Sequence, residues 1–148
     1  MTNTSSGESP VRDCPEAILA FWFGTGEERG KRRAAWFKKD AAFDDEIRSR
    51  FLVTYELAAS GHLVHWQGQA HSCLALIVVL DQFPRNMFRG SPRAFAADAL
   101  ARETTLCALK HGFDTAMKPV ERQFIYLPLG RESTLDELEF LKSPGSGF

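Results

Sequence analysis

Apolar positions recur at helical spacing along this chain, most clearly between residues 41 and 59. Five of them share one face of a helix, because they recur every three or four residues: Phe43, Ile47, Phe51, Tyr55 and Ala58. Acidic residues lie near the start of this segment, where the helix dipole favours negative charge. The pattern predicts an amphipathic helix over 41–59, with Asp40 as its N-cap and Gly61 as its C-terminal stop.

Shorter helices are predicted by the same patterning and by proline and glycine punctuation, at 15–23, 31–37, 69–82, 92–111, 119–127 and 135–141. The helix over 69–82 holds the run 74–80, which is apolar on every side and could also be a buried strand. We favour a buried helix because no second strand-like run is present to pair with it. Pro84 disfavours helical geometry at Phe83, so this helix is expected to end there and residues 85–90 to form a turn. Ser91 is the expected cap of the next helix.

About six helices joined by short turns, with no strand partners, indicate an all-α fold. We expect an antiparallel helical array or bundle, formed by residues 14–142 as a single domain. The polar residues 1–13 are predicted to be a disordered leader. Residues 143–148 contain Ser, Pro and Gly and are predicted to be a flexible tail.

Composition removes several functional classes. The chain has 148 residues, a net charge of −1 and three cysteines. This charge provides no overall field toward nucleic acid or an anionic membrane, and the basic run within 31–39 is interpreted as a solvated helix face. No apolar stretch approaches the ~20 residues of a transmembrane helix, and the N-terminus lacks an apolar signal core. Three cysteines without paired spacing predict a reducing, cytoplasmic location.

One segment stands out chemically, because it begins with an acid at the end of the wholly apolar helix and then carries three arginines within nine positions. In the structural interpretation, Asp81 pairs with Arg85 or caps backbone donors, which offsets the cost of burying its charge. Arg89 and Arg93 would then simply be exposed. The segment would act as a buried polar joint that locks two helices together.

The functional alternative is a small anion site in the same segment. Arginines offer forked donors to a carboxylate or a phosphate, and the helix start at Ser91 and Pro92 would add free backbone N–H groups. Asp81 and Asn86 would orient the arginines or the ligand. The candidate ligand-binding residues are therefore Asp81, Gln82, Arg85, Asn86, Arg89 and Arg93.

The remaining reactive side chains suggest no site. His62, His65 and His71 match no zinc spacing, so they are interpreted as surface histidines. A nucleophile pair of His71 and Cys73 is disfavoured, because residues two apart on a helix do not face each other. The sequence has no Gly-rich phosphate loop, nucleophile elbow or paired His-Glu metal motif. We therefore assign no catalytic residue, metal or cofactor, and favour a non-enzymatic function.

The arginine-rich segment also belongs to a longer pattern, made of residues 18–24, 36–40, 43–44, 47–51, 80–89, 93–95, 98–101 and 126–128. In these pieces the sequence resembles the DUF924 family, uncharacterised bacterial proteins that are grouped with tetratricopeptide-like (TPR-like) folds. The resemblance covers about residues 14–129. It implies an all-α, TPR-like array and no known activity.

The resemblance ends after residues 126–128. The family continues there with a His-Ser-Glu motif and more helices, whereas this chain reads Leu-Gly-Arg-Glu-Ser over 129–133. The family's last helices are therefore expected to be missing, together with half of any site built from residues 80–89, the core motif of the resemblance, and that His-Ser-Glu. An array without its terminal helices exposes apolar surface, which favours self-association or instability.

Three functions follow as hypotheses. The first is a binding or scaffold module that takes a protein or peptide partner, by analogy with other TPR-like arrays. The second is an enzyme or binder of a small anionic metabolite, which would use the segment around Asp81, Arg85 and Asn86. The third is a shortened family member with impaired function.

Overall fold

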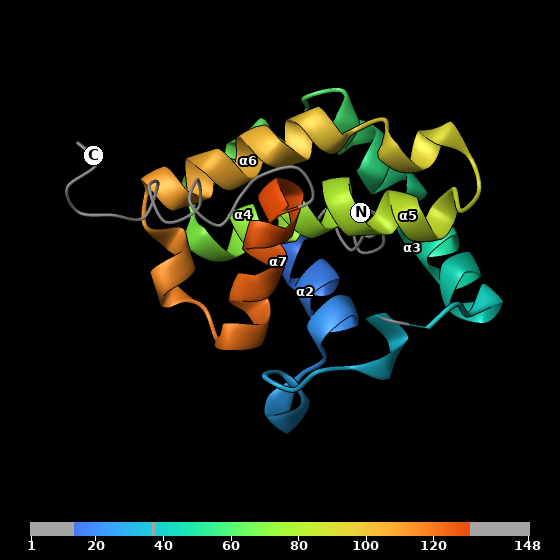
Figure 1. Ribbon diagram of the computed structural model, residues 1–148, viewed down its shortest axis with the longest axis horizontal. Helices are drawn as coiled ribbons and strands as arrows, with labels where there is room; N and C mark the ends of the chain where they lie inside the picture. Colours follow the sequence, from blue (N-terminus) through green and yellow to red (C-terminus); the bar gives the residue numbers. More distant parts are fainter. Residues whose placement is uncertain (1–13, 37, 131–148) are drawn as a thin grey trace, which may run out of the picture.

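The computed structural model describes residues 14–36 and 38–130, and these fold entirely as helices and connecting turns. Figure 1 shows the helices in sequence order: α2 (Pro15–Phe23), α3 (Ala41–Ala59), α4 (Ala70–Ile77), α5 (Phe83–Met87), α6 (Asp98–Lys110) and α7 (Pro119–Gly130). Short 3₁₀ turns lie between them at Gly26–Glu28, Ala34–Trp36, Val64–Gly68, Pro92–Phe95 and Phe113–Ala116. The described residues contain no strand, so the predicted all-α class is confirmed. The TPR-like arrangement stays a prediction.

Several predictions fall outside the described residues. These are the disordered leader at 1–13, the helix at 135–141 and the flexible tail at 143–148. Within the described ranges, no helix combines the length and the apolarity needed to cross a bilayer.

Helix α3 has the bounds that its apolar pattern predicts, because both of its ends carry local stop signals. The Asp40 carboxylate accepts hydrogen bonds from two backbone N–H groups of the first turn, at 3.0 and 3.2 Å. At the other end the His62 N–H donates to the Leu57 carbonyl at 2.9 Å, and Gly61 has a φ of +87°. This pairing satisfies carbonyls that the helix itself leaves open.

Helix α4 is the predicted central helix, and every residue from Cys73 to Asp81 is buried. It runs directly into one turn of π-helix, Val78–Gln82, and then into α5. Figure 1 shows this helical segment crossing the middle of the molecule between α6 and α3. An isolated buried strand is excluded, because each backbone group here is bonded within the helix.

The predicted end of this helix at Phe83 is wrong. Phe83 keeps helical dihedrals (φ −58°, ψ −42°), and Pro84 lies in the first turn of α5 instead of beginning a turn at 85–90. The preceding π-turn explains the difference. A proline clashes with the carbonyl four residues before it in a regular α-helix, and the wider π-turn relieves such clashes.

Two further predicted helices are shorter in the structure. The helix predicted at 31–37 is a single 3₁₀ turn, Ala34–Trp36, because Arg33 and Trp36 fold back over the end of α2. Arg33 donates to the carbonyls of Phe21 and Trp22 at 2.8 and 2.7 Å, and the Trp36 indole donates to the Trp22 carbonyl at 2.9 Å. These bonds satisfy carbonyls at the end of α2 and fix the connection across it.

The helix predicted from Pro92 to His111 is interrupted. Ser91 is the predicted cap, since its Oγ accepts from the Arg93 N–H at 3.2 Å, but the 3₁₀ turn it opens ends at Phe95. Ala97 then leaves helical geometry (φ −102°, ψ 12°), and α6 begins at Asp98. The break turns Asp98 toward Arg85, a contact that no local pattern indicates.

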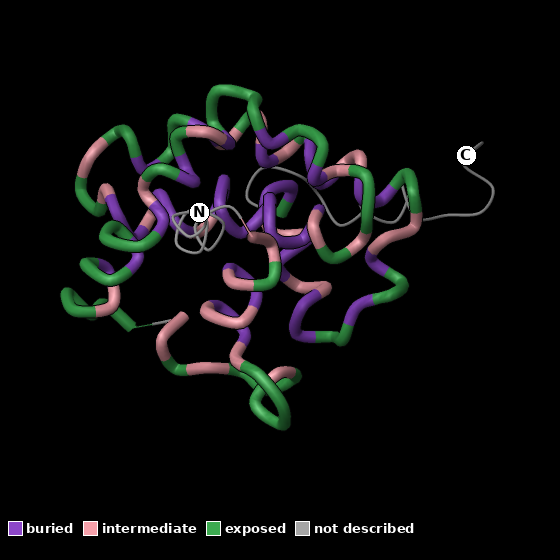
Figure 2. The backbone as a smooth tube through the Cα atoms, turned by 180° about the vertical axis from the view of Figure 1, so that it is seen from behind, coloured by how far each residue is buried: buried purple, intermediate pink, exposed green. Residues whose placement is uncertain are grey.

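The core is a cluster of aromatic rings around α2, α3 and α5. Trp22 meets Phe83 edge-on with ring centres 5.8 Å apart, and Phe51 stacks on Phe83 at 5.0 Å. Phe124 of α7 closes the cluster against Trp36 at 4.8 Å. Figure 2 shows the buried positions running through the middle of the molecule while the outer turns of the surrounding helices are exposed.

Candidate functional site

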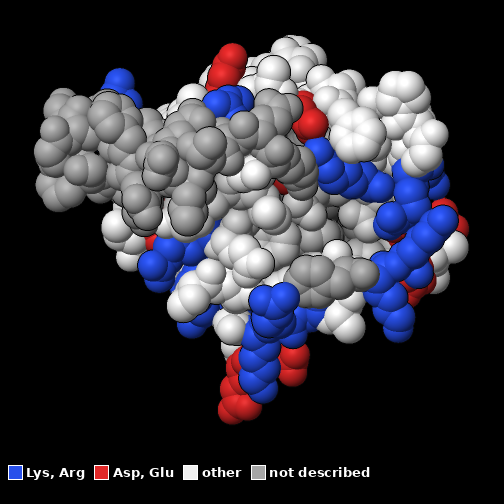
Figure 3. Space-filling model, in the orientation of Figure 1, with Lys and Arg blue, Asp and Glu red and all other residues white. Residues whose placement is uncertain are grey.

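The core motif lies where the π-turn, α5 and the following residues pass between α3 and α6. Asp81 is on the π-turn, Arg85 and Asn86 are on α5, and Arg89 follows its last turn. Figure 3 shows basic side chains gathered on the side of the molecule where α3 and α5 lie. The geometry of the arginines therefore decides whether this surface is free to bind a ligand.

Arg85 is held by two carboxylates. Its Nη1 donates to the Asp81 carbonyl at 2.6 Å and lies 3.5 Å from the Asp81 carboxylate, as the structural interpretation predicts. The two Nη atoms also form a forked pair with Asp98 at 3.0 and 3.1 Å. Asp81 is 1% exposed, and its other oxygen accepts from Gln82 at 2.8 Å. Burying this carboxylate is tolerated because each of its oxygens has a partner.

Arg89 forms a second fork, with Asp44 of α3. Arg89 Nε and Nη2 lie 2.9 and 3.1 Å from the two Asp44 oxygens, and Asn86 donates to one of them at 2.8 Å. Burial alone would raise the pKa of Asp44, but the hydrogen bonds from Arg89 and Asn86 and the charges of Arg89 and Arg48 outweigh it. The pKa of Asp44 therefore lies below its ordinary value.

Arg93 is the most exposed of the three arginines, and it forms no fork with a carboxylate of the described residues. Its side chain is 56% exposed and approaches Glu56 only at 3.9 Å. The guanidinium lies over the Phe88 ring, 3.9 Å from its centre, and Phe95 receives Arg85 in the same way at 5.0 Å. The prediction that Arg89 and Arg93 are exposed is confirmed. Arg89 is also engaged by Asp44, which that prediction did not include.

The arrangement is a polar joint among α3, α5 and α6. Each forked arginine faces a carboxylate of the chain itself, so those donors are already used. Neither acidic partner, Asp44 or Asp98, is among the ligand-binding residues predicted from the sequence. A signal existed for Asp44: it precedes Ile47 by three residues and Phe51 by seven, which places an acid on the apolar face of α3.

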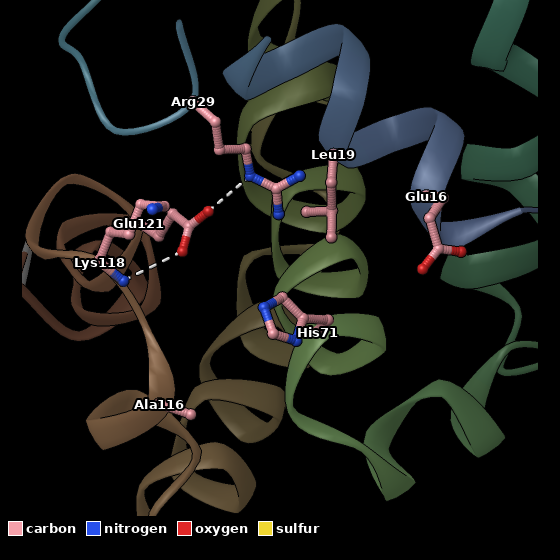
Figure 4. A pocket seen from close by; sticks show the side chains of 7 residues that line it. All are labelled: Glu16, Leu19, Arg29, His71, Ala116, Lys118 and Glu121. Atoms are coloured by element: carbon pink, nitrogen blue, oxygen red, sulfur yellow. Dashed lines mark hydrogen bonds and ion pairs between the residues drawn. The ribbon is translucent and has the colours of Figure 1, made fainter. Parts of the chain in front are cut away.

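A separate hollow of about 460 Å³ opens between α2, α4 and the start of α7. Figure 4 shows the seven residues that line it: Glu16, Leu19, Arg29, His71, Ala116, Lys118 and Glu121. A volume of this size lies within the ~300–1,000 Å³ of ordinary small-ligand pockets. No motif indicated this hollow, because its residues come from four separate parts of the chain.

Glu121 organises one wall of the hollow. It is 2% exposed, and its carboxylate receives Arg29 Nε at 2.7 Å and the Lys118 backbone N–H at 3.1 Å. The second bond closes the first turn of α7, since a glutamate at the third helical position commonly reaches back to the N-cap N–H. In Figure 4 the Arg29 guanidinium extends past Glu121 into the hollow, beside Leu19 and above His71.

The remaining reactive residues follow their predicted environments. The three cysteines are free, and burial, with a smaller effect from Cys107, raises the pKa of Cys73 to about 12. His62, His65 and His71 are exposed, as expected, although His71 also lines the hollow. Among the described residues, no group of three His, Cys, Asp or Glu side chains is placed to hold a metal ion.

Comparison with known proteins finds one matching family model and a similar solved structure, both described as of unknown function. The model of a family described as "bacterial protein of unknown function (DUF924)" matches residues 18–130. A solved structure of a protein of unknown function from Agrobacterium tumefaciens superposes with a TM-score of 0.73 at 37% sequence identity. That match covers 86% of this chain and 69% of the Agrobacterium chain. No curated protein matches this sequence.

Proposed function

Because this chain belongs to the DUF924 family, whose description assigns no activity, we propose a function from its geometry: a helical binding module whose ligand enters the hollow between α2, α4 and α7. The observation that carries the proposal is the contrast between the two polar regions. The arginines of the core motif are engaged by Asp44 and Asp98, whereas the hollow is open and presents charged side chains toward its interior.

The hypothesis of an anion site in the core motif has less support. A carboxylate or phosphate ligand would have to displace Asp98 from Arg85 or Asp44 from Arg89, and each displaced acid would lose its forked partner. Arg93 remains exposed. The 3₁₀ turn that follows Ser91 has only four residues, however, so it is not the helix start whose backbone N–H groups that hypothesis requires. The hypothesis of a shortened, impaired family member concerns residues 131–148, which lie outside the described ranges.

The test is a ligand screen with a pair of matched variants. The folded protein is screened by ligand-observed NMR against free amino acids, short peptides, and carboxylated and phosphorylated metabolites. Ala116→Trp fills the hollow with a ring, while Ala99→Trp places the same ring on an exposed position of α6 outside its lining. We expect hits whose affinity falls roughly ten-fold or more in Ala116→Trp and is kept in Ala99→Trp.

Two results would count against the proposal. One is a well-folded protein that binds nothing in the screen. The other is a set of hits that both tryptophan variants bind equally. If Arg93→Ala then abolishes binding of those hits, the anion-site hypothesis is supported instead.

A further inference from the structure

We infer that the hollow binds a small zwitterion, with a carboxylate on Arg29 and an ammonium group toward Glu16. This inference rests on the proposed function and names the ligand class of the same site. It follows from how the charges are distributed among the side chains that line the hollow.

Among the described residues that line the hollow, the formal charges balance. Two are basic, Arg29 and Lys118, and two are acidic, Glu16 and Glu121. A hollow with no net charge has no overall attraction for a polyanion such as a phosphorylated metabolite. A ligand that is itself neutral overall, but carries separated charges, matches this distribution best.

The charges are also separated in space. Glu121 is engaged by Arg29 Nε and the Lys118 backbone N–H, so its carboxylate is satisfied within the chain. Arg29 uses only its Nε atom for that bond, and its Nη groups point into the hollow (Figure 4). Two parallel N–H groups of a guanidinium are suited to receive a carboxylate.

The opposite wall is acidic. Glu16 lies in the first turn of α2, is exposed, and lines the hollow on the side away from Glu121 (Figure 4). A ligand anchored on Arg29 therefore meets the Glu16 carboxylate at its far end, where the Cys14 thiol donates to that carboxylate at 3.9 Å. An exposed acid there favours an ammonium group and disfavours a second anion. Leu19 and Ala116 add apolar surface between the two ends.

The experiment compares ligands that differ by one charge. The twenty standard amino acids are titrated into the full chain by isothermal calorimetry at neutral pH. The strongest binder is then compared with its carboxamide, which lacks the carboxylate, with its N-acetyl form, which lacks the ammonium group, and with inorganic phosphate. We expect the zwitterion to bind roughly ten-fold more tightly than either derivative or phosphate.

The decisive variant is Glu16→Gln, because Glu16 is exposed and its loss leaves no buried charge unpaired. We expect it to weaken binding of the zwitterion roughly five-fold and to leave binding of the N-acetyl form unchanged. Glu103→Gln removes an exposed acid of α6 outside the hollow and is the matched control, with no expected effect. Arg29→Lys keeps the partner of buried Glu121 while removing the fork, and is expected to weaken every ligand that carries a carboxylate.

The outcomes separate the two proposals. Equal affinity for the zwitterion and its N-acetyl form, or tighter binding of phosphate, overturns the inference that the ligand is a zwitterion. The binding module still stands in that case if Ala116→Trp abolishes the binding. Ligands that bind equally well to Ala116→Trp and to the unaltered chain overturn both. If no amino acid, derivative or phosphate binds a folded sample, the zwitterion is overturned, while the binding module stands if another compound of the ligand screen binds and loses affinity in Ala116→Trp.

Discussion

At the scale of residues, the core motif is best understood through the two carboxylates that face it. Asp44 and Asp98 come from different helices, yet each receives both arms of an arginine that lies on or just beyond α5. The forked geometry fixes the direction of the guanidinium as well as its distance. The arginines thereby join helices far apart in sequence, and their loss should be visible in stability.

Replacing Arg89 by alanine is predicted to lower the free energy of unfolding by about 1–2 kcal/mol, because buried Asp44 loses its forked partner. The value is kept low because the Arg89 side chain is 38% exposed and solvent screens the pair. Urea denaturation measures the change. Arg93→Ala, which removes an exposed arginine, is the control and should cost less than about 0.5 kcal/mol. Equal effects of the two substitutions would contradict the claim that the fork between Arg89 and Asp44 stabilises the fold.

Asp44 is also predicted to make stability depend on pH. Its folded-state pKa is lowered, so the ionised form stabilises the fold above the unfolded-state pKa of about 3.9, and this contribution is lost as the pH falls through the lower folded-state value. Asp44→Asn cannot titrate there. The difference in unfolding free energy between the unaltered chain and Asp44→Asn should be largest near about pH 7 and should decrease below about pH 4. A difference that stays constant across this range would contradict the assignment.

At the scale of elements, local residues explain where some helices end and not where others do. Helix α3 begins and ends where Asp40 and Gly61 place it. The segment from α4 to α5 passes through Pro84 because a π-turn precedes it. A local stop signal therefore predicts a helix end correctly where it satisfies backbone groups close to it in the chain. The prediction is wrong where a neighbouring turn changes the pattern of backbone hydrogen bonds.

Gly61 provides a test at this scale. Its φ of +87° is costly for any residue with a Cβ, whereas a Cβ there would meet no atom within 4 Å, so the penalty is purely conformational. Gly61→Ala is predicted to cost about 1–2 kcal/mol in thermal or urea unfolding. Gly68→Ala is the matched control, because that glycine has equal space and no positive φ. The explanation fails if both alanines are tolerated alike.

At the scale of the whole molecule, one core connects all the helices. Buried residues from α2, α3, α4, α6 and α7 form a single cluster, with the central segment from α4 to α5 in contact with the others. A continuous core of this kind leaves no boundary along which one part could unfold alone. The polar joint lies at its edge, and the hollow opens where α2, α4 and α7 diverge.

The molecule is therefore predicted to unfold as one cooperative unit. Tryptophan fluorescence reports on Trp22 and Trp36, which stack on each other, and on Trp66 of the Val64–Gly68 turn. Far-ultraviolet circular dichroism reports on all helices. The two signals should give the same midpoint and the same slope in urea. Two separated transitions would show that the helices belong to more than one cooperative unit.

The helical class, the bounds of α3 and the burial of α4 could be predicted from the sequence alone, and the pairing of Asp81 with Arg85 was one of two structural interpretations that it offered. These features depend on periodicity, on caps and on contacts between residues close in the chain, which a single sequence records directly.

The contacts between distant parts of the chain could be seen only in the folded molecule. The forks from Arg85 to Asp98 and from Arg89 to Asp44, and the hollow lined by Arg29 and Glu121, join residues that are 13 to 92 positions apart. Such contacts depend on how helices pack, and packing depends on side-chain shape across the whole core, which no local pattern encodes. Hydrogen bonds along a helix join residues that are close in the sequence. The partner of a buried charge, in contrast, depends on which helices pack against each other.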